Sequence, residues 1–214
     1  MSISIRNSAA DVSSHAAVRW FWIVFAVSTV FQGVRLVQDS PGSWLAIDYA
    51  MRIVSLALLA FSPVRAAVFR REPRRVNSEQ LVASLLIAGV AIFLIVLIGR
   101  KLSDILPDLS FGHYPRTTGW LHRFDLAFGI ALVAIHEELV FRRLARLAFS
   151  RLEDGFAMIA ATSLVFALYH WWTGPWNVLM VAVVGVVLMM LYRAVGALWP
   201  AILMHYCVDL YAFW

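Results

Sequence analysis

The fold of this chain is decided by a stretch at residues 124–142 that reads FDLAFGIALVAIHEELVFR. Most of this stretch is apolar, and its last turns carry Glu137, Glu138 and Arg142. Its length is close to the roughly 20 residues that a helix needs to cross a bilayer. Ionisable residues inside a membrane are rare, and they usually face a bundle interior or a wet cavity where they serve a function. The stretch therefore predicts a membrane helix with a functional centre near its end.

The composition of the whole chain is that of an integral membrane protein. Hydrophobic residues make up 62% and charged residues 14% of the 214 residues, and the mean hydropathy is +0.78. Apolar runs of nearly membrane-spanning length occur at 17–37, 44–62, 80–99, 124–141, 156–172, 176–193 and 196–213. We expect an all-α polytopic bundle of about seven transmembrane helices, with a range of six to eight. No repeat or long linker divides the chain, so residues 1–214 are predicted to form one domain.

The apolar run at 44–62 contains two charges, Asp48 and Arg52. Their spacing of four residues places both on one face of a helix, where they can neutralise each other. A paired charge near a helix end explains them without any role in function, so we leave both outside the predicted site.

Arginines in the loops predict how the bundle is oriented. The loop at 63–77 carries five arginines against one glutamate, and short cytoplasmic loops are enriched in Lys and Arg. We therefore expect this loop and the N-terminus in the cytoplasm, and the basic segment 142–154 on the same side. The loop at 100–123 would then lie outside, although its four basic residues fit that side imperfectly. The first apolar run lacks a cleavage signature and is expected to be an anchor.

The net charge of +5 is explained by these loops and their contact with anionic lipid headgroups. The lipid bilayer is therefore an expected partner, and no nucleic-acid partner is needed.

Helix geometry gives the adjacent carboxylates different surroundings. At 3.6 residues per turn, Glu138 and Arg142 lie about 40° apart on one face, whereas Glu137 is turned by about 100° from Glu138. Glu138 is predicted to pair with Arg142, which leaves Glu137 free to face a cavity. On this helix alone, the alternative stays open that both acids only neutralise the arginines that follow.

Two later runs carry further polar residues at helical spacing. His170 follows Phe166 by four residues, and Asp209 follows His205 by four residues inside the last apolar run. At a rise of 1.5 Å per residue, Glu137 lies roughly 27 Å before the turn at residues 154–155 and His170 roughly 22 Å after it. His205 lies roughly 14 Å past the turn at residue 196, so these depths are compatible with one site.

Two other kinds of catalytic centre were weighed. His136-Glu137 resembles the start of a zinc-protease helix, but that motif needs a second histidine at position 140, which is Val140. A zinc site made of Glu137, His170 and His205 remains chemically possible, because three N or O ligands and a water suffice. The single cysteine, Cys207, points away from His205 by about 200° around the helix, so it is expected to be a packing residue rather than a nucleophile.

The sequences EELVFR at 137–142, FALYH at 166–170 and HYCVD at 205–209 occur in this order on successive runs. Together they resemble the signatures E-E-x-x-x-R, F-x-x-x-H and H-x-x-x-N/D of the CPBP family of intramembrane proteases, also called the CAAX protease or Abi family. The resemblance covers about residues 120–213, and the N-terminal half shares only its hydrophobicity.

The resemblance implies a glutamic endopeptidase that works inside the membrane without a metal cofactor, with zinc as the alternative. It implies that Glu137 and His170 activate a water and that His205 and Asp209 stabilise the oxyanion. The supporting residues would be Glu138, Arg142 and Phe166.

The expected substrate is a membrane-associated protein or peptide, including a C-terminal tail or sorting segment. Asp209 in place of Asn is the form common in bacterial members, so a bacterial inner membrane is the expected location. A non-catalytic immunity or scaffold protein stays open as an alternative. Trp171, Trp172, Trp176 and Trp199 could line an access path, but an interfacial aromatic belt explains them more simply.

Overall fold

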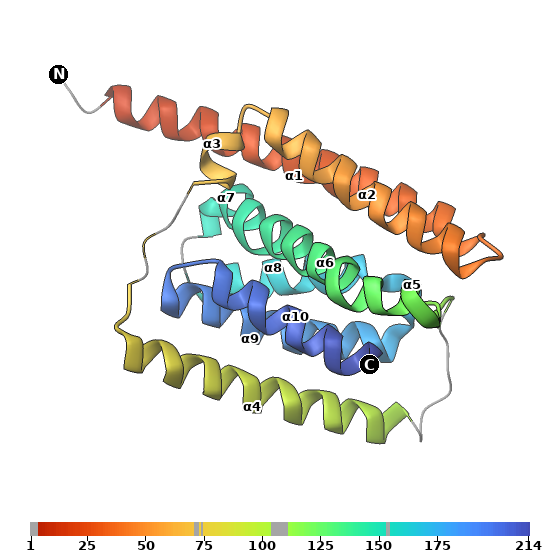
Figure 1. The fold of residues 1–214 in the computed structure, drawn as a ribbon. Coiled ribbons are helices and arrows are strands. Elements are labelled where there is room, and N and C mark those ends of the chain that lie inside the picture. The colour runs from red at the N-terminus through yellow and green to blue at the C-terminus, as the bar shows by residue number, and fades with distance from the viewer. Residues whose placement is uncertain (1–3, 71–72, 74, 104–110, 153–154) are drawn as a thin grey trace.

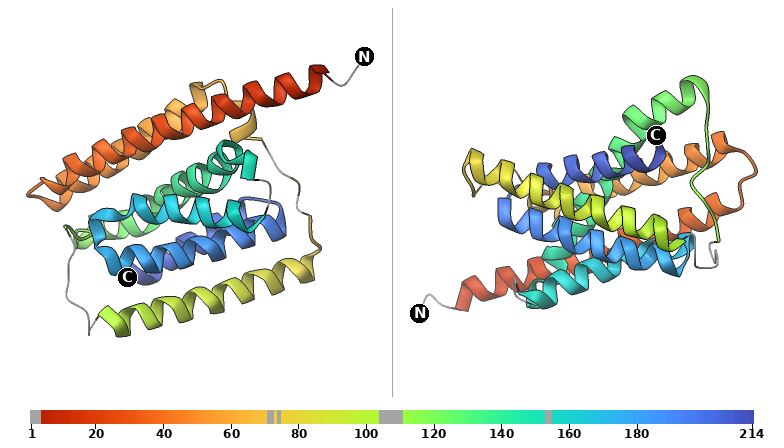
Figure 2. Two further views of the ribbon diagram at one scale, coloured as in Figure 1. Left: turned by 180° about the vertical axis from the view of Figure 1, so that it is seen from behind. Right: turned by 90° about the horizontal axis from the view of Figure 1, so that it is seen from below.

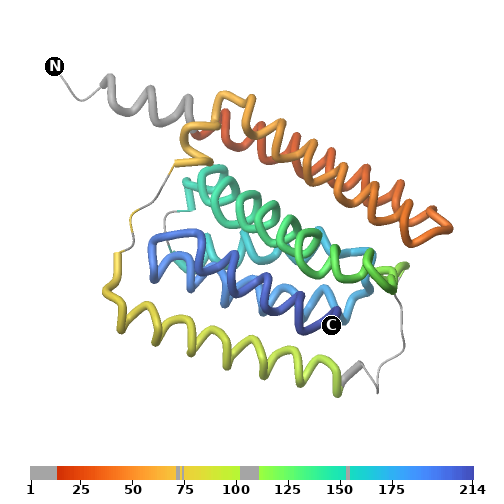
Figure 3. Tube along the Cα trace, viewed as in Figure 1, coloured from red at the N-terminus to blue at the C-terminus, as the bar shows by residue number. Residues whose placement is uncertain are grey.

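A computed structural model describes residues 4–70, 73, 75–103, 111–152 and 155–214, with side chains from residue 14 onward except at residues 102 and 103 (Figure 3). In this part of the chain every regular element is a helix, which confirms the expected all-α class. Some of the predicted loop features lie outside the described residues, namely Arg71, Glu72, Arg74, residues 104–110 and Asp154.

Each of the seven apolar runs lies on a helical segment. These segments are α1 (Ser4–Leu36), α2 (Pro41–Phe61), α4 (Ser78–Ser103), a continuous helix from α5 (Gly119–Phe124) through α6 (Ile130–Glu138) to α7 (Ala145–Ala148), α8 (Phe156–Tyr169), α9 (Pro175–Val195) and α10 (Trp199–Phe213). Shorter elements are α3 (Arg65–Val68) and the 3₁₀ turns η3 (Ser150–Leu152) and η4 (Trp171–Thr173).

Four of these helices are long and apolar enough to cross a bilayer, within the residues that the structure describes. The candidate spans are Ser14–Leu36, Pro41–Phe61, Ser78–Lys101 and Pro175–Val195, and Phe156–Tyr169 is a shorter apolar helix. The chain is thus an integral membrane protein with several apolar helices.

Local signals in the sequence explain where helices begin and end. The Ser40 side chain accepts a hydrogen bond from the Ser43 amide at the start of α2, and Pro41 occupies the first turn, where no amide donor is needed. At the end of α9, Gly196 adopts a left-handed backbone with φ of 78°, which lets the chain turn directly into α10.

The helices form three groups in space. The hairpin α1–α2 lies on one side of the molecule and α4 on the other, with α6, α8, α9 and α10 between them (Figures 1 and 2). Helix α8 packs on α9, α10 packs on α6, α2 reaches α6, and α4 closes the far side against α9. The middle group therefore holds the three motif-bearing helices, and α2 contacts one of them directly.

The two arginine-rich segments lie at one end of the bundle. Helix α3 lies there beside the helix that ends in α7, and α7 packs against α1 (Figure 1). Two residues before α7, Nε of Arg143 donates a hydrogen bond to the carbonyl oxygen of Ala67 in α3 at 3.0 Å. The loop around α3 and the segment after Arg142 therefore share a side.

The helix from Gly119 to Ala148 is not regular along its whole length. Two stretches, η1 (Asp125–Gly129) and η2 (Leu139–Leu144), have the wider hydrogen bonding of a π-helix. Such turns are rare and are often found at functional sites. The pair Glu137-Glu138 ends α6 and lies directly before the second of them.

Candidate active site

Glu138 and Arg142 form the ion pair that the helical spacing predicts. Nε of Arg142 lies 3.1 Å from Oε2 of Glu138, and both side chains are fully buried. The guanidinium of Arg142 also lies over the ring of Phe166, 4.5 Å from its centre. The pair thus links the helix α6–η2 to α8.

Phe166 holds several motif side chains at once. Its buried ring meets the ring of His170 edge-on at 4.9 Å between centres and that of His205 at 6.0 Å. Its backbone oxygen lies 2.9 Å from Nδ1 of His170, which fits donation by Nδ1–H. In a neutral imidazole this bond leaves Nε2 unprotonated and able to accept a proton.

Glu137 lies between the two motif histidines. Its Oε2 is 3.7 Å from Nε2 of His170 and 3.8 Å from Nε2 of His205, and the carboxylate is almost completely buried. Among the described residues, Oε2 has no hydrogen-bond partner. The structure therefore brings together residues from α6, α8 and α10 that are far apart in the sequence.

His205 connects the remaining motif residues. Its Nδ1 lies 2.9 Å from Oε1 of Glu138, and its Nε2 lies 3.5 Å from Oδ2 of Asp209. Asp209 and His170 are the least enclosed of these residues, since 17% of each side chain is exposed. All seven motif residues thus lie in one connected cluster.

The structure corrects two expectations about Glu137 and Arg52. Glu137 is not free of a partner, because Nη1 of Arg52 lies 3.0 Å from its Oε1. Arg52 is not confined to a pair at a helix end either, since it is buried and bridges Asp48 on α2 to Glu137 on α6. The i, i+4 pair of Asp48 and Arg52 was predicted correctly, but the contact with Glu137 depends on how α2 packs against α6.

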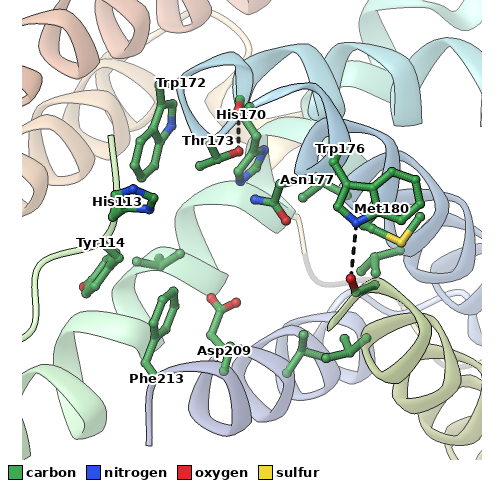
Figure 4. Close-up of a pocket in the computed structure, with 18 of the residues that line it drawn as sticks. His113, Tyr114, His170, Trp172, Thr173, Trp176, Asn177, Met180, Asp209 and Phe213 are labelled. Carbon is green, nitrogen blue, oxygen red and sulfur yellow. Dashed lines mark hydrogen bonds between the residues drawn. The ribbon is translucent and has the colours of Figure 1, made fainter. Parts of the chain in front are cut away.

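A cavity of about 690 Å³ opens onto the cluster. Glu137, His170, His205 and Asp209 all contribute to its lining. In Figure 4, His170 and Asn177 lie across the cavity from Asp209. Apolar side chains make up most of the remaining wall, and they come from α4, α6, α9 and α10: Ile95, Val96, Ile130, Val133, Met180, Val181, Val184 and Val208.

The described end of the loop after α4 forms a strap beside the cavity. The amides of Phe111 and Gly112 donate to the carbonyl oxygen of Trp172 at 2.9 and 3.0 Å. Tyr114 then stacks on Phe213 with 4.4 Å between ring centres, and its hydroxyl donates to Asp125 at 3.0 Å. The described end of this irregular segment therefore lies beside the cavity.

The four tryptophans divide into two kinds. Trp172 is buried and Trp176 is half-buried, and both line the cavity. Trp171 and Trp199 are exposed at the surface, as in an interfacial belt. The belt thus accounts for two of them, and the cavity wall for the other two.

Other candidate chemistries find less support in the geometry. In the described part of the chain, no group of three or more His, Cys, Asp or Glu side chains is arranged to hold a metal ion. Cys207 is exposed rather than packed, which corrects the expected packing role. His136 is buried, with Nδ1 3.3 Å from Nη1 of Arg52.

Comparison with known proteins agrees with the motifs. Residues 119–211 match the family model described as type II CAAX prenyl endopeptidase Rce1-like. This segment is similar to that family. The match confirms the resemblance drawn from the three signatures, over the Rce1-like segment that carries them. Neither a curated protein nor a solved structure matches the chain significantly.

The Rce1-like segment begins at the first residue of α5 and ends inside α10. It contains every residue of the three motifs. Helices α1, α2 and α4 precede it, although α4 lines the cavity and α2 supplies Arg52.

Proposed function

We propose that this protein is an intramembrane endopeptidase in which Glu137 and His170 activate a water for attack on a peptide bond. The observation that carries the proposal is the position of Glu137 Oε2. It lies 3.7 and 3.8 Å from the Nε2 atoms of two histidines, beside a cavity of about 690 Å³. A water in contact with Oε2 would also be within reach of both imidazoles and of a carbonyl in the cavity.

The reaction balances with the residues at hand. The water gives one proton to Glu137 or His170 as its oxygen bonds to the scissile carbonyl carbon. The carbonyl oxygen becomes an oxyanion, and on collapse the carbon–nitrogen bond breaks. The proton taken from the water then passes to the leaving amine, which yields a new carboxylate and a new amino terminus.

His205 is proposed to stabilise the oxyanion. Because its Nδ1 faces Glu138, Nε2 carries a proton for donation only when the ring is an imidazolium. Charge balance supports that form, since among the described residues of this cluster one negative charge remains uncompensated. The charged members are three arginines and four carboxylates: Arg35, Arg52, Arg142, Asp48, Glu137, Glu138 and Asp209. A buried cluster is costly unless its charges are paired.

Asp209 is proposed to orient His205 rather than to touch the oxyanion. An ionised carboxylate accepts hydrogen bonds and cannot donate one. Its Oδ2 lies 3.5 Å from Nε2 of His205, on the cavity side.

The substrate is proposed to be a membrane-associated protein or peptide, with a C-terminal tail or sorting segment as the first class to test. The mostly apolar cavity wall suits a segment that enters from the bilayer. We place the N-terminus and the arginine-rich end of the bundle in the cytoplasm, in a bacterial inner membrane. No metal cofactor is assigned, and no nucleic acid is a partner.

The test is cleavage of a panel of candidate tail peptides by the purified full chain in liposomes. Wild type and Glu137→Ala are compared, each with and without a zinc chelator. Loss of cleavage in Glu137→Ala, together with no effect of the chelator on wild type, supports a glutamate-activated water. Chelator sensitivity would move the assignment to the zinc alternative. If wild type cleaves no peptide while Glu137→Ala still rescues a knockout phenotype, a scaffold role would be favoured.

A further inference from the structure

We propose that Arg52 positions the carboxylate of Glu137 for catalysis, so that the hairpin α1–α2 is a working part of the active site. This inference rests on the proposed function, because it assigns a partner to the same glutamate. Arg52 lies outside the Rce1-like segment, which begins at residue 119.

The contact with Arg52 gives the two carboxylate oxygens of Glu137 different partners. Nη1 of Arg52 binds Oε1 at 3.0 Å, while Oε2 faces His170 and His205. A carboxylate held through one oxygen by a guanidinium keeps its orientation, and it offers the other oxygen to the cavity. Charge-assisted hydrogen bonds of this kind are short and directional. The same Nη1 also lies 3.3 Å from Nδ1 of His136, so the guanidinium touches two neighbouring residues of α6.

Arg52 is itself held rigidly from its own helix. Its Nε donates to Oδ2 of Asp48 at 2.9 Å and its Nη2 to Oδ1 at 3.1 Å. This two-point contact uses the planar fork of donors that a guanidinium has and an ammonium lacks. Arg52 can therefore hold Asp48 through two donors and Glu137 through a third, whereas a lysine lacks this planar two-point contact.

The chain of charges continues into α1. Arg35 donates to Oδ1 of Asp48, and both side chains are buried. The guanidinium of Arg35 lies between the rings of Trp44 and Trp172, at 4.3 Å from each centre. Trp172 is two residues after His170 and lines the cavity. A series of contacts thus connects the cavity wall to Glu137. It begins at Trp172 and continues through side chains of alternating charge, namely Arg35, Asp48 and Arg52.

A second contact ties α1 to the histidine side of the site. Nε2 of Gln32 donates to the backbone oxygen of Tyr169 at 3.0 Å. Tyr169 immediately precedes His170 at the end of α8. The N-terminal hairpin therefore contacts both the glutamate and the segment that carries its partner histidine.

A merely structural role for Arg52 makes a different prediction from a positioning role. Removing one member of a buried ion pair destabilises a protein whatever its function. Positioning predicts in addition that the folded variant binds substrate normally and turns it over slowly, because the general base is misplaced. The ratio of kcat loss to KM change separates the two.

The experiment uses the full chain in liposomes and a tail peptide that wild type cleaves. We expect Arg52→Gln to lower kcat by about 100-fold, since misplacing a catalytic group by about 1 Å can cost that much, with KM nearly unchanged. Arg52→Lys keeps the charge and loses the fork, so its kcat should lie between those of Arg52→Gln and wild type. The matched control is Ser55→Ala, which removes the buried hydrogen bond between α1 and α2 at 3.1 Å and should leave kcat nearly unchanged.

A second readout does not depend on activity. Unfolding midpoints are measured for Arg52→Gln, Glu137→Gln and the double variant. Because Arg52→Gln leaves a buried carboxylate without its partner, adding Glu137→Gln should recover part of the lost stability. If Arg52→Gln does not fold, Arg52→Lys carries the kcat comparison and the double variant carries the pairing.

The outcomes keep the two proposals apart. Wild-type kcat in Arg52→Gln, a loss confined to KM, or an equal loss in Ser55→Ala would overturn the positioning role while the endopeptidase stands. If wild type cleaves no peptide, the proposed function fails, and the positioning role fails with it even where the unfolding midpoints still show a coupled pair.

Discussion

Nδ1 of His205 lies 2.9 Å from Oε1 of Glu138, so the second glutamate of the pair fixes the histidine that faces the first. Nε2 of the same ring lies 3.8 Å from Oε2 of Glu137. Adjacent carboxylates on one helix thus have separate tasks: Glu138 holds Arg142 and His205 in place, and Glu137 faces the cavity.

Removing the donor of the proposed oxyanion contact should slow cleavage strongly. We expect His205→Phe to lower kcat by about 100- to 1,000-fold, the usual cost of losing one such donor. The measurement is single-turnover cleavage in liposomes. A kcat within a few-fold of wild type would show that the oxyanion is stabilised elsewhere.

Asp209→Asn tests whether Asp209 acts through His205. The amide oxygen can still accept a hydrogen bond from Nε2 of His205, and its nitrogen adds a donor on the cavity side. We expect cleavage to stay within about 10-fold of wild type. Asp209→Ala should lose more, because it leaves no side chain to accept from Nε2 of His205. Equal loss in both variants would mean that the negative charge itself is needed.

Breaking the Glu138–Arg142 pair should affect folding before chemistry. Arg142→Met leaves a fully buried carboxylate without its arginine, and we expect a cost of about 3–5 kcal/mol in unfolding free energy. Denaturant titration in detergent measures it. The variant Arg142→Met with Glu138→Gln should be more stable than Arg142→Met alone; if it is not, the pair is not the source of the loss.

Gly185 permits the close packing of α9 on α8 behind the site. A Cβ at this position would lie 3.1 Å from the Phe166 ring and 3.3 Å from Cβ of Ser163. We expect Gly185→Val to cost about 1–3 kcal/mol through overpacking, and to lower kcat because Phe166 contacts both histidines. Gly33→Ala in α1 is the control, because nothing lies within 4 Å of its Cβ position. It should be neutral or stabilising by up to about 1 kcal/mol.

Narrowing the cavity should change which substrates are cut. Val184 lines the cavity, whereas its neighbour Val183 is exposed on the outer face of α9. We expect Val184→Phe to reduce kcat/KM for peptides with bulky apolar residues by about 10-fold or more, and to spare small ones. Val183→Phe should leave the whole series unchanged. Equal effects of both variants would argue that the cavity is not where the peptide lies.

Much of this architecture is visible in the sequence because it depends on local pattern. The apolar runs predicted the helices, and the spacing of Glu138 and Arg142 predicted their pair. Rise per residue also placed Glu137, His170 and His205 at compatible depths, and the structure brings them together. These inferences need only the geometry of single helices and the turns between them.

What could not be predicted depends on how helices pack side by side. Arg52 reaches Glu137 across 85 positions of sequence, and hydropathy does not say which face of α2 meets α6. The sequence nevertheless contained one indication. Burying the charged pair of Asp48 and Arg52 inside an apolar run costs free energy, so such residues usually serve a function. The π-helical turns around α6 gave no such signal in the sequence.

The most direct test of the central claim is the turnover number of Glu137→Gln in liposomes. The substitution keeps the size of the side chain and removes the base, and Glu79→Gln, an exposed acid on α4, is the control. We expect kcat of Glu137→Gln to fall by at least about 1,000-fold with the protein still folded, while Glu79→Gln cleaves like wild type. Cleavage by Glu137→Gln at close to the wild-type rate would contradict the central claim.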